Sequence, residues 1–318
     1  MITLFKHNNP IALILLLVLA TLPEWRGTYE AFPNGNNTAL LQRFFEDYLH
    51  LLKNQTTGLR IVNTLMLLAE SLYLNKIIND HRLMEKPGFI PAMTFLLVQA
   101  ILPFRITTFF ILINGLVLIM IKLMIIVYKQ ERANNNLIGA GFTVGLLATL
   151  NSGYWTIYLW LITALFIMRP ASSKEWLICT LGFLMPFYFI LSLQYLNDQL
   201  DIKQFLSDFG LAFIVPVYNP IIWLKISLIA LLSFIGLWIY SSAIGKMVIQ
   251  NRKTYMLIFI LVLVFLGLLV IKFGNIALEI MLLVAPASFL IAPIFISFKK
   301  EFIPNLLFFL LIVLALIR

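Results

Sequence analysis

The chain has 318 residues, of which 61% are hydrophobic and only 12% are charged, and its formal net charge at pH 7 is +9. Soluble domains carry roughly 25% charged residues, so this composition excludes a water-soluble fold and indicates a polytopic helical membrane protein. No run of basic residues with interleaved aromatics occurs, so the charge is explained by lysines and arginines in membrane loops and not by a nucleic-acid partner.

Apolar stretches follow one another along most of the chain, and a helix needs about 20 residues to cross a bilayer. We therefore predict an all-α bundle that forms one integral membrane domain over residues 1–318. The central pair of stretches is short and is interrupted by "NSGYW", so a shallow hairpin there would lower the predicted eleven spans to nine. The stretches cover residues 10–23, 59–78, 88–104, 107–128, 137–151, 153–168, 176–196, 219–241, 254–272, 276–297 and 303–317.

The placement of lysines and arginines predicts an inside N-terminus and an outside C-terminus. With this orientation, every inner loop between spans carries at least two basic residues, and the outer excess is confined to the first outer loop, residues 24–57. Within that loop, residues 38–54 read "TALLQRFFEDYLHLLKN", with apolar residues at three- and four-residue steps. This pattern predicts an amphipathic helix lying in the membrane interface.

Two carboxylates follow the first apolar stretch, in the sequence "PEWRGTYE". Glu24 and Glu30 would lie at the outer membrane surface, at the level of a lipid headgroup, where a carboxylate could act as a general base toward an acceptor hydroxyl. The simpler alternative is that Pro23 ends the helix, that Trp25 and Tyr29 are interfacial anchors, and that the charges are solvated.

Four basic residues fall near the same outer level and are candidates for binding a lipid phosphate, which arginine in particular binds in a bidentate manner. Lysines and arginines at helix ends also act as ordinary snorkelling anchors, and this alternative stays open. The candidates are Arg60, Arg105, Lys225 and Lys272.

Two further carboxylates lie within apolar stretches, where ionisable groups are costly and often functional. Glu70 stands near the middle of its stretch and Glu279 about one turn inside the outer end of another. Each could hold a proton or pair with a cation, or could be a hydrogen-bonded carboxyl facing a neighbouring helix. The three histidines lie on different segments, so we predict no metal site, and no motif indicates a cofactor.

Gly141 and Gly145 in "GAGFTVGLLA" are four residues apart and predict a small-residue face for close helix packing. The run "GFTVGLLATLNSGYWTIYLWLITALFIMRPASSKEWLICTLGFLMPFYFI" resembles an uncharacterised family of multi-pass inner-membrane proteins from Bacteroidota. The runs "LYLNKIINDHRLMEKPGFIPAMTFLLVQAILPF" and "LLVAPASFLIAPIFISFKKEFIPNLLFFLLIVLALI" resemble it too. The resemblance implies a bacterial inner membrane and no particular activity.

The layout is also similar to that of GT-C membrane glycosyltransferases, which have an inside N-terminus, a long first outer loop and acidic residues just after the first helix. The chain departs from them by lacking an Asp-containing acidic pair and a soluble outer domain. The likeness implies an envelope-biogenesis transferase that uses a polyprenyl-phosphate-linked sugar, with the bilayer and that lipid as partners. Two alternatives stay open: a non-catalytic subunit or scaffold of an envelope assembly or secretion complex that binds other membrane proteins, and a transporter or lipid flippase with Glu70 as coupling site.

Overall fold

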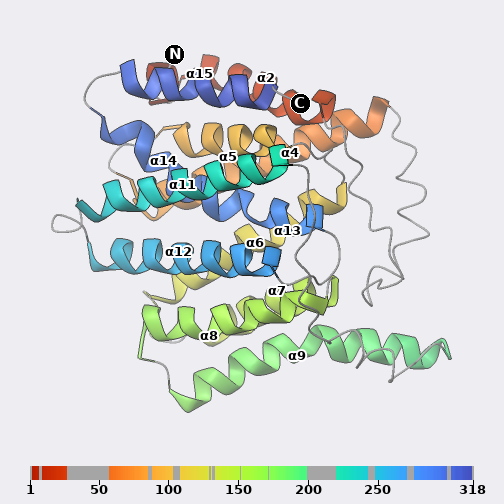
Figure 1. The fold of residues 1–318 in the computed structure, drawn as a ribbon. Helices are drawn as coiled ribbons and strands as arrows, with labels where there is room; N and C mark the ends of the chain where they lie inside the picture. The colour runs from red at the N-terminus through yellow and green to blue at the C-terminus, as the bar shows by residue number, and fades with distance from the viewer. Residues whose placement is uncertain are drawn as a thin grey trace.

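The computed structural model contains thirteen α-helices and one short 3₁₀ helix in the part of the chain that it describes (Figure 1). No strand occurs among these residues, so the prediction of an all-α fold is confirmed for them. The described residues are 2–6, 9–26, 57–84, 88–102, 108–128, 130, 133–150, 152–170, 172–198, 220–242, 248–270, 276–298 and 302–316.

The helices follow the predicted apolar stretches one by one. The α-helices are α1 (Ile2–Lys6), α2 (Pro10–Arg26), α4 (Thr57–Asp80), α5 (Ile90–Ile101), α6 (Thr108–Val127), α7 (Asn134–Leu150), α8 (Thr156–Met168), α9 (Ser173–Leu196), α11 (Pro220–Ser242), α12 (Ile249–Val270), α13 (Ile276–Leu282), α14 (Val284–Ser297) and α15 (Phe302–Leu316). The interfacial helix predicted for residues 38–54 lies outside the described residues.

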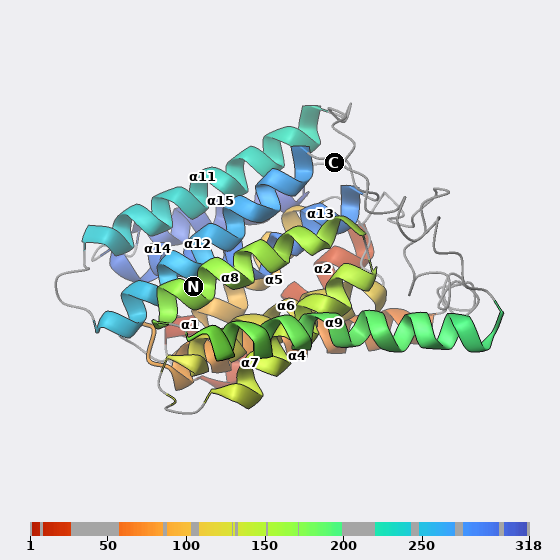
Figure 2. The ribbon, with the colours of Figure 1, turned by 90° about the horizontal axis from the view of Figure 1, so that it is seen from below.

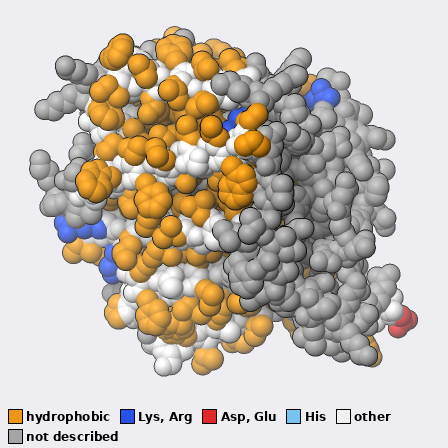
Figure 3. All heavy atoms as spheres, in the orientation of Figure 1, with side chains coloured by type: hydrophobic (Ala, Val, Ile, Leu, Met, Phe, Trp, Pro, Cys, Tyr) orange, Lys and Arg blue, Asp and Glu red, His pale blue; other side chains and the backbone are white. Residues whose placement is uncertain are grey.

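Five of the described helices are long and apolar enough to cross a membrane, namely those over residues 58–80, 110–127, 173–196, 220–241 and 249–269. Shorter apolar helices also occur, with α5 and α8 between these spans in the sequence and α15 after the last of them. Hydrophobic side chains cover most of the described part of the face in Figure 3, where a few lysines and arginines show at the left edge and in the upper part of the view. A soluble monomer rarely exposes so large an apolar surface, so this is the architecture of an integral membrane protein.

Prolines affect two helices in different ways. The stretch 276–297 is divided at Leu283 into α13 and α14, because Pro286 cannot donate to the carbonyl of Leu282 and its ring crowds that carbonyl. The expectation that Pro23 ends the first helix is wrong, since α2 continues to Arg26 with Pro23 inside it. Proline removes only its own donor, so the residues that follow it can still continue the last turn of a helix.

The helices run roughly parallel to one axis, and most consecutive helices alternate in direction (Figures 1 and 2). Most links between consecutive helices are short, the longest being those before α4 and before α11, and the helix ends give the bundle two ends. We call the end where α4 and α8 finish and α5, α9 and α12 begin the basic end. The opposite end, where α2 finishes and α11 and α13 begin, is called the Glu24 end.

Glycines bring α7 and α9 into close contact, as the sequence predicted for Gly141 and Gly145. A Cβ atom on Gly141 would overlap backbone atoms of Cys179 and Phe183, and one on Gly182 would lie 2.5 Å from the carbonyl oxygen of Ile138. Helix α9 packs mainly against α7, lies at the edge of the bundle, and is only 28% buried over its candidate span (Figure 1). The glycines therefore hold the most exposed of the five candidate spans to the rest of the protein.

Helices α8 and α12 are joined by polar contacts as well as by packing. The buried indole N–H of Trp160 donates to the carbonyl oxygen of Leu257 at 3.0 Å. The ammonium of Lys253 donates to the carbonyl oxygen of Met168 at 3.0 Å. Met168 is the last residue of α8, whose terminal carbonyl oxygens have no partner within the helix. Lys253 thus satisfies a helix C-terminus with a cation, the favourable sign for that end of a helix dipole.

Candidate functional site

The two ends of the bundle carry different charges among the described residues. The basic end has many cations and few carboxylates, whereas the Glu24 end has as many carboxylates as cations. The basic end carries Lys6, Lys76, Arg82, Arg169, Lys174, Arg252 and Lys253 with Asp80 and Glu175, and the Glu24 end carries Glu24, Asp198 and Glu279 with Arg26, Arg60 and Lys225.

Glu24 stands two residues before the end of α2, and its side chain is only 3% exposed. Helix α2 packs against α4 and α5, and the Glu24 carboxyl is buried although it lies near a helix end. Glu24 also has a hydrogen-bonding or electrostatic partner, so it is not an isolated charge. The expectation of a solvated charge at this position is therefore wrong, and Glu24 is a buried ionisable group.

Lys225 lies in the second turn of α11 and is 4% exposed, although Ile221, Trp223 and Leu224 around it are exposed. Its side chain is therefore covered by the protein, unlike that of a snorkelling anchor, which keeps its head in water. Glu279, in the first turn of α13, is also buried. Both residues have hydrogen-bonding or electrostatic partners.

The remaining predicted residues are placed less completely. Arg60, in the first turn of α4, is exposed, as an ordinary interfacial anchor would be. Glu30, Arg105 and Lys272 lie outside the described residues. Glu24, Lys225 and Glu279 therefore lie at the same end of the bundle, and the larger site that also includes Glu30, Arg105 and Lys272 stays a prediction.

Glu70 lies in the middle of α4, and its side chain is 9% exposed, as expected for an intramembrane carboxyl. It faces α6, where a Cβ atom added at Gly115 would lie 3.1 Å from Oε1 of the carboxyl. Further along the same two helices, the ammonium of Lys122 lies 5.2 Å from the centroid of the Tyr73 ring. The two charged groups of this interface have different partners.

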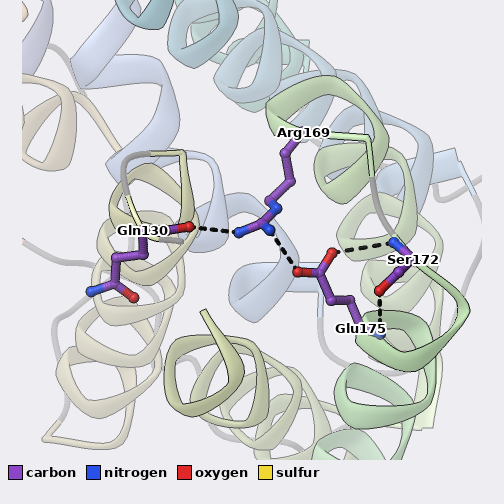
Figure 4. A network of polar contacts seen from close by, with 4 residues as sticks. All are labelled: Gln130, Arg169, Ser172 and Glu175. Carbon is purple, nitrogen blue, oxygen red and sulfur yellow. Dashed lines mark hydrogen bonds and ion pairs between the residues drawn. The ribbon is translucent and has the colours of Figure 1, made fainter. Parts of the chain in front are cut away.

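A polar network at the basic end was not expected from the sequence (Figure 4). Arg169, directly after α8, donates to the backbone carbonyl oxygen of Gln130 at 2.8 Å and pairs with Glu175 at 2.8 Å. Ser172 and Glu175 form a reciprocal capping box at the start of α9. The sequence "SSKE" carries the S-x-x-E signature of this cap, so Ser172 and Glu175 could have been predicted. The network joins the ends of three helices and is a structural feature.

The described residues offer limited chemistry. No group of three or more His, Cys, Asp or Glu side chains among them could hold a metal ion. Lys225 has a buried ammonium, and Glu24 and Glu279 have buried carboxyls. An ammonium can bind a phosphate and a carboxylate can accept a proton, and both functions are needed to transfer a group from a lipid phosphate. No family model, curated protein or solved structure matches the chain.

Proposed function

We propose that the chain is a multi-pass protein of a bacterial inner membrane that crosses it eleven times, with the basic end in the cytoplasm and α13 and α14 counted as one crossing. The excess of lysine and arginine at the basic end supports this orientation, because basic residues collect in cytoplasmic loops. Helix α5 has only 12 residues, but all of them are buried, so its ends are surrounded by protein and need not reach the lipid headgroups.

Cysteine accessibility in the full chain tests this orientation. In a Cys179→Ser background, Asn135→Cys and Ser173→Cys should react with a membrane-impermeant maleimide only after the membrane is opened. Asp201→Cys should react in intact spheroplasts, because it would lie in an outer loop. Labelling of Asn135→Cys in intact spheroplasts would reverse the orientation.

We propose further that the Glu24 end binds the phosphate of a polyprenyl lipid and transfers its sugar, as a GT-C-like enzyme would. One observation carries the proposal: Glu24, Lys225 and Glu279 are all buried at one end of an apolar helical bundle. Buried ionisable residues are costly in a membrane protein and commonly mark substrate sites. Lys225, with Arg60, Arg105 and Lys272, would neutralise the phosphate, and Glu24 or Glu30 would take the proton of the acceptor hydroxyl.

Binding of polyprenyl monophosphate to the protein in nanodiscs tests the site. Lys225→Ala should weaken binding about ten- to a hundredfold, because a hydrogen bond to a charged group contributes about 1.5–3 kcal/mol. Lys225→Arg should retain most of the affinity, which separates loss of charge from misfolding. Lys174→Ala, at the basic end, is the matched control. Equal binding by wild type and Lys225→Ala, both folded, would exclude this site.

The alternative of a non-catalytic subunit is favoured by one feature, the second half of α9. Tyr188, Leu193, Tyr195 and Leu196 are between 51% and 75% exposed, and this half of α9 extends away from the other labelled helices (Figures 1 and 2). A helix from another membrane protein could pack there. Co-purification of a second membrane protein that is lost with Tyr188→Ala would support this alternative.

A further inference from the structure

The interface between α4 and α6 holds a carboxyl that the proposed lipid-phosphate site does not use. Glu70 lies in the helix over residues 58–80, which is long and apolar enough to cross a membrane, and faces the candidate span 110–127 of α6. Its position near the middle of α4 puts it about 20 Å along the helix from Thr57. Glu70 is therefore distant from the charged residues at the helix ends.

Gly115 makes room for this carboxyl. An added Cβ atom at Gly115 would lie 3.1 Å from Oε1 of Glu70, so the absence of a side chain lets the carboxyl approach the α6 backbone. The carboxyl therefore lies directly against the backbone of α6 at Gly115.

The second oxygen of this carboxyl has no partner. Oε2 of Glu70 is buried and makes no hydrogen bond. Lys122 is the ionisable residue of α6, and Tyr73 is the one nearest to Glu70 along α4. Lys122 lies over the Tyr73 ring and forms no ion pair with Glu70. Helix α5 contains no ionisable residue, and the only carboxyl of α2, Glu24, lies at its far end. No described cation neutralises Glu70.

We propose that Glu70 is a proton-binding site inside the membrane, with Oε2 as the atom that takes and releases the proton. A buried carboxylate without a cation is unfavourable in apolar surroundings, and a proton is the smallest ligand that neutralises it. A purely structural carboxylic acid would donate its O–H to a neighbouring acceptor. Oε2 has no such acceptor, so the surrounding side chains do not lock the proton in place.

The site is independent of the lipid-phosphate site and gives the bundle a way to respond to protons. Glu70 lies against α6 at Gly115, so gain or loss of its proton changes the charge buried between two candidate spans. Any movement of α4 against α6 is thereby coupled to proton binding. The ligand is the proton itself, with no metal cation involved.

Labelling with dicyclohexylcarbodiimide tests this proposal in the purified full-length protein. This apolar reagent reacts with protonated carboxyls: the acid proton moves to a carbodiimide nitrogen, and the carboxyl oxygen adds to the central carbon. Mass spectrometry of peptides should locate the adduct on Glu70, and its yield should fall about tenfold for each pH unit above the midpoint. Glu70→Gln, of equal size, should lose the adduct and stay folded.

Two controls sharpen the result. Glu175, paired with Arg169, should remain unlabelled under the same conditions. Gly115→Ala should shift the pH at which half of the label is lost, whereas Gly139→Ala, whose Cβ would instead meet a Leu123 methyl at 3.2 Å, should not. No adduct at pH 6 in folded protein, or a yield that does not change with pH, overturns the proposal. Protection by sodium ions at fixed pH overturns it too, because the ligand would then be a metal cation.

Discussion

Replacing Gly141 by leucine should force α7 away from α9 and destabilise the folded protein. The new side chain would occupy space filled by the backbone of α9 near Cys179, and a backbone cannot turn aside as a flexible side chain can. Overpacking typically costs about 1–3 kcal/mol, and a rigid helix–helix contact should place Gly141→Leu at or above the top of that range. Since α9 packs mainly against α7, few other contacts would keep it in place.

Thermal denaturation in detergent measures this effect, with Gly267→Leu as the matched control. A Cβ on Gly267 would meet nothing within 4 Å, so the same substitution there adds a side chain to the exposed surface. Gly141→Leu should lower the midpoint clearly and Gly267→Leu should leave it nearly unchanged. Equal losses in the two variants would mean that the α7–α9 contact is not set by glycine.

Glu24→Gln should lower the rate of sugar transfer by about a hundred- to ten-thousand-fold, the usual loss when a general base is removed. The amide has nearly the size of the carboxyl, so it should keep the packing of α2 on α4 and α5 while being unable to accept the proton. The measurement is consumption of a polyprenyl-phosphate-linked sugar by protein in proteoliposomes. Glu30→Gln distinguishes the two carboxylates proposed for this role.

Asp198→Asn is the matched control for this prediction. Asp198 is an exposed carboxyl at the same end of the bundle, just after α9. Its φ of 53° lies in the left-handed region, which asparagine also tolerates, so the substitution removes a charge without backbone strain. Equal rates for Glu24→Gln and wild type would remove Glu24 from catalysis, and an equal loss with Asp198→Asn would indicate an effect of surface charge.

The helices could be predicted from the sequence because lipid imposes a simple requirement: backbone groups must be paired within each apolar stretch. The break at "NSGYW" was also predictable, since the short 3₁₀ helix Ser152–Trp155 lies there. Pro286 and Pro293 indicate a kink within residues 276–297, but the division at Leu283 itself could not be placed from the sequence, because a proline inside a helix is often accommodated, as Pro23 is in α2. Proline shows where a helix can break, and its neighbours decide whether it does.

Burial at the candidate site could not be predicted in the same way. Helix α11 is apolar around most of its circumference, so its sequence does not show which side faces the bundle or that Lys225 lies on that side. Glu24 is buried although it lies near the end of α2, and its burial depends on how the chain packs around α2, which the sequence does not show. The backbone carbonyl of Gln130 that accepts from Arg169 has no sequence signature at all, whereas the Ser172–Glu175 cap does.

The partners of α8 lie far ahead of it in the order of synthesis. Trp160 and the carbonyl of Met168 bond to residues 97 and 85 positions later, so a ribosome must complete α9 and α11 before either partner exists. Helix α8 has only 13 residues and cannot bridge a bilayer core of about 30 Å by itself. During synthesis, α8 must therefore remain without these two hydrogen bonds until α12 has been made. Assembly of this region is thus a late step in biogenesis.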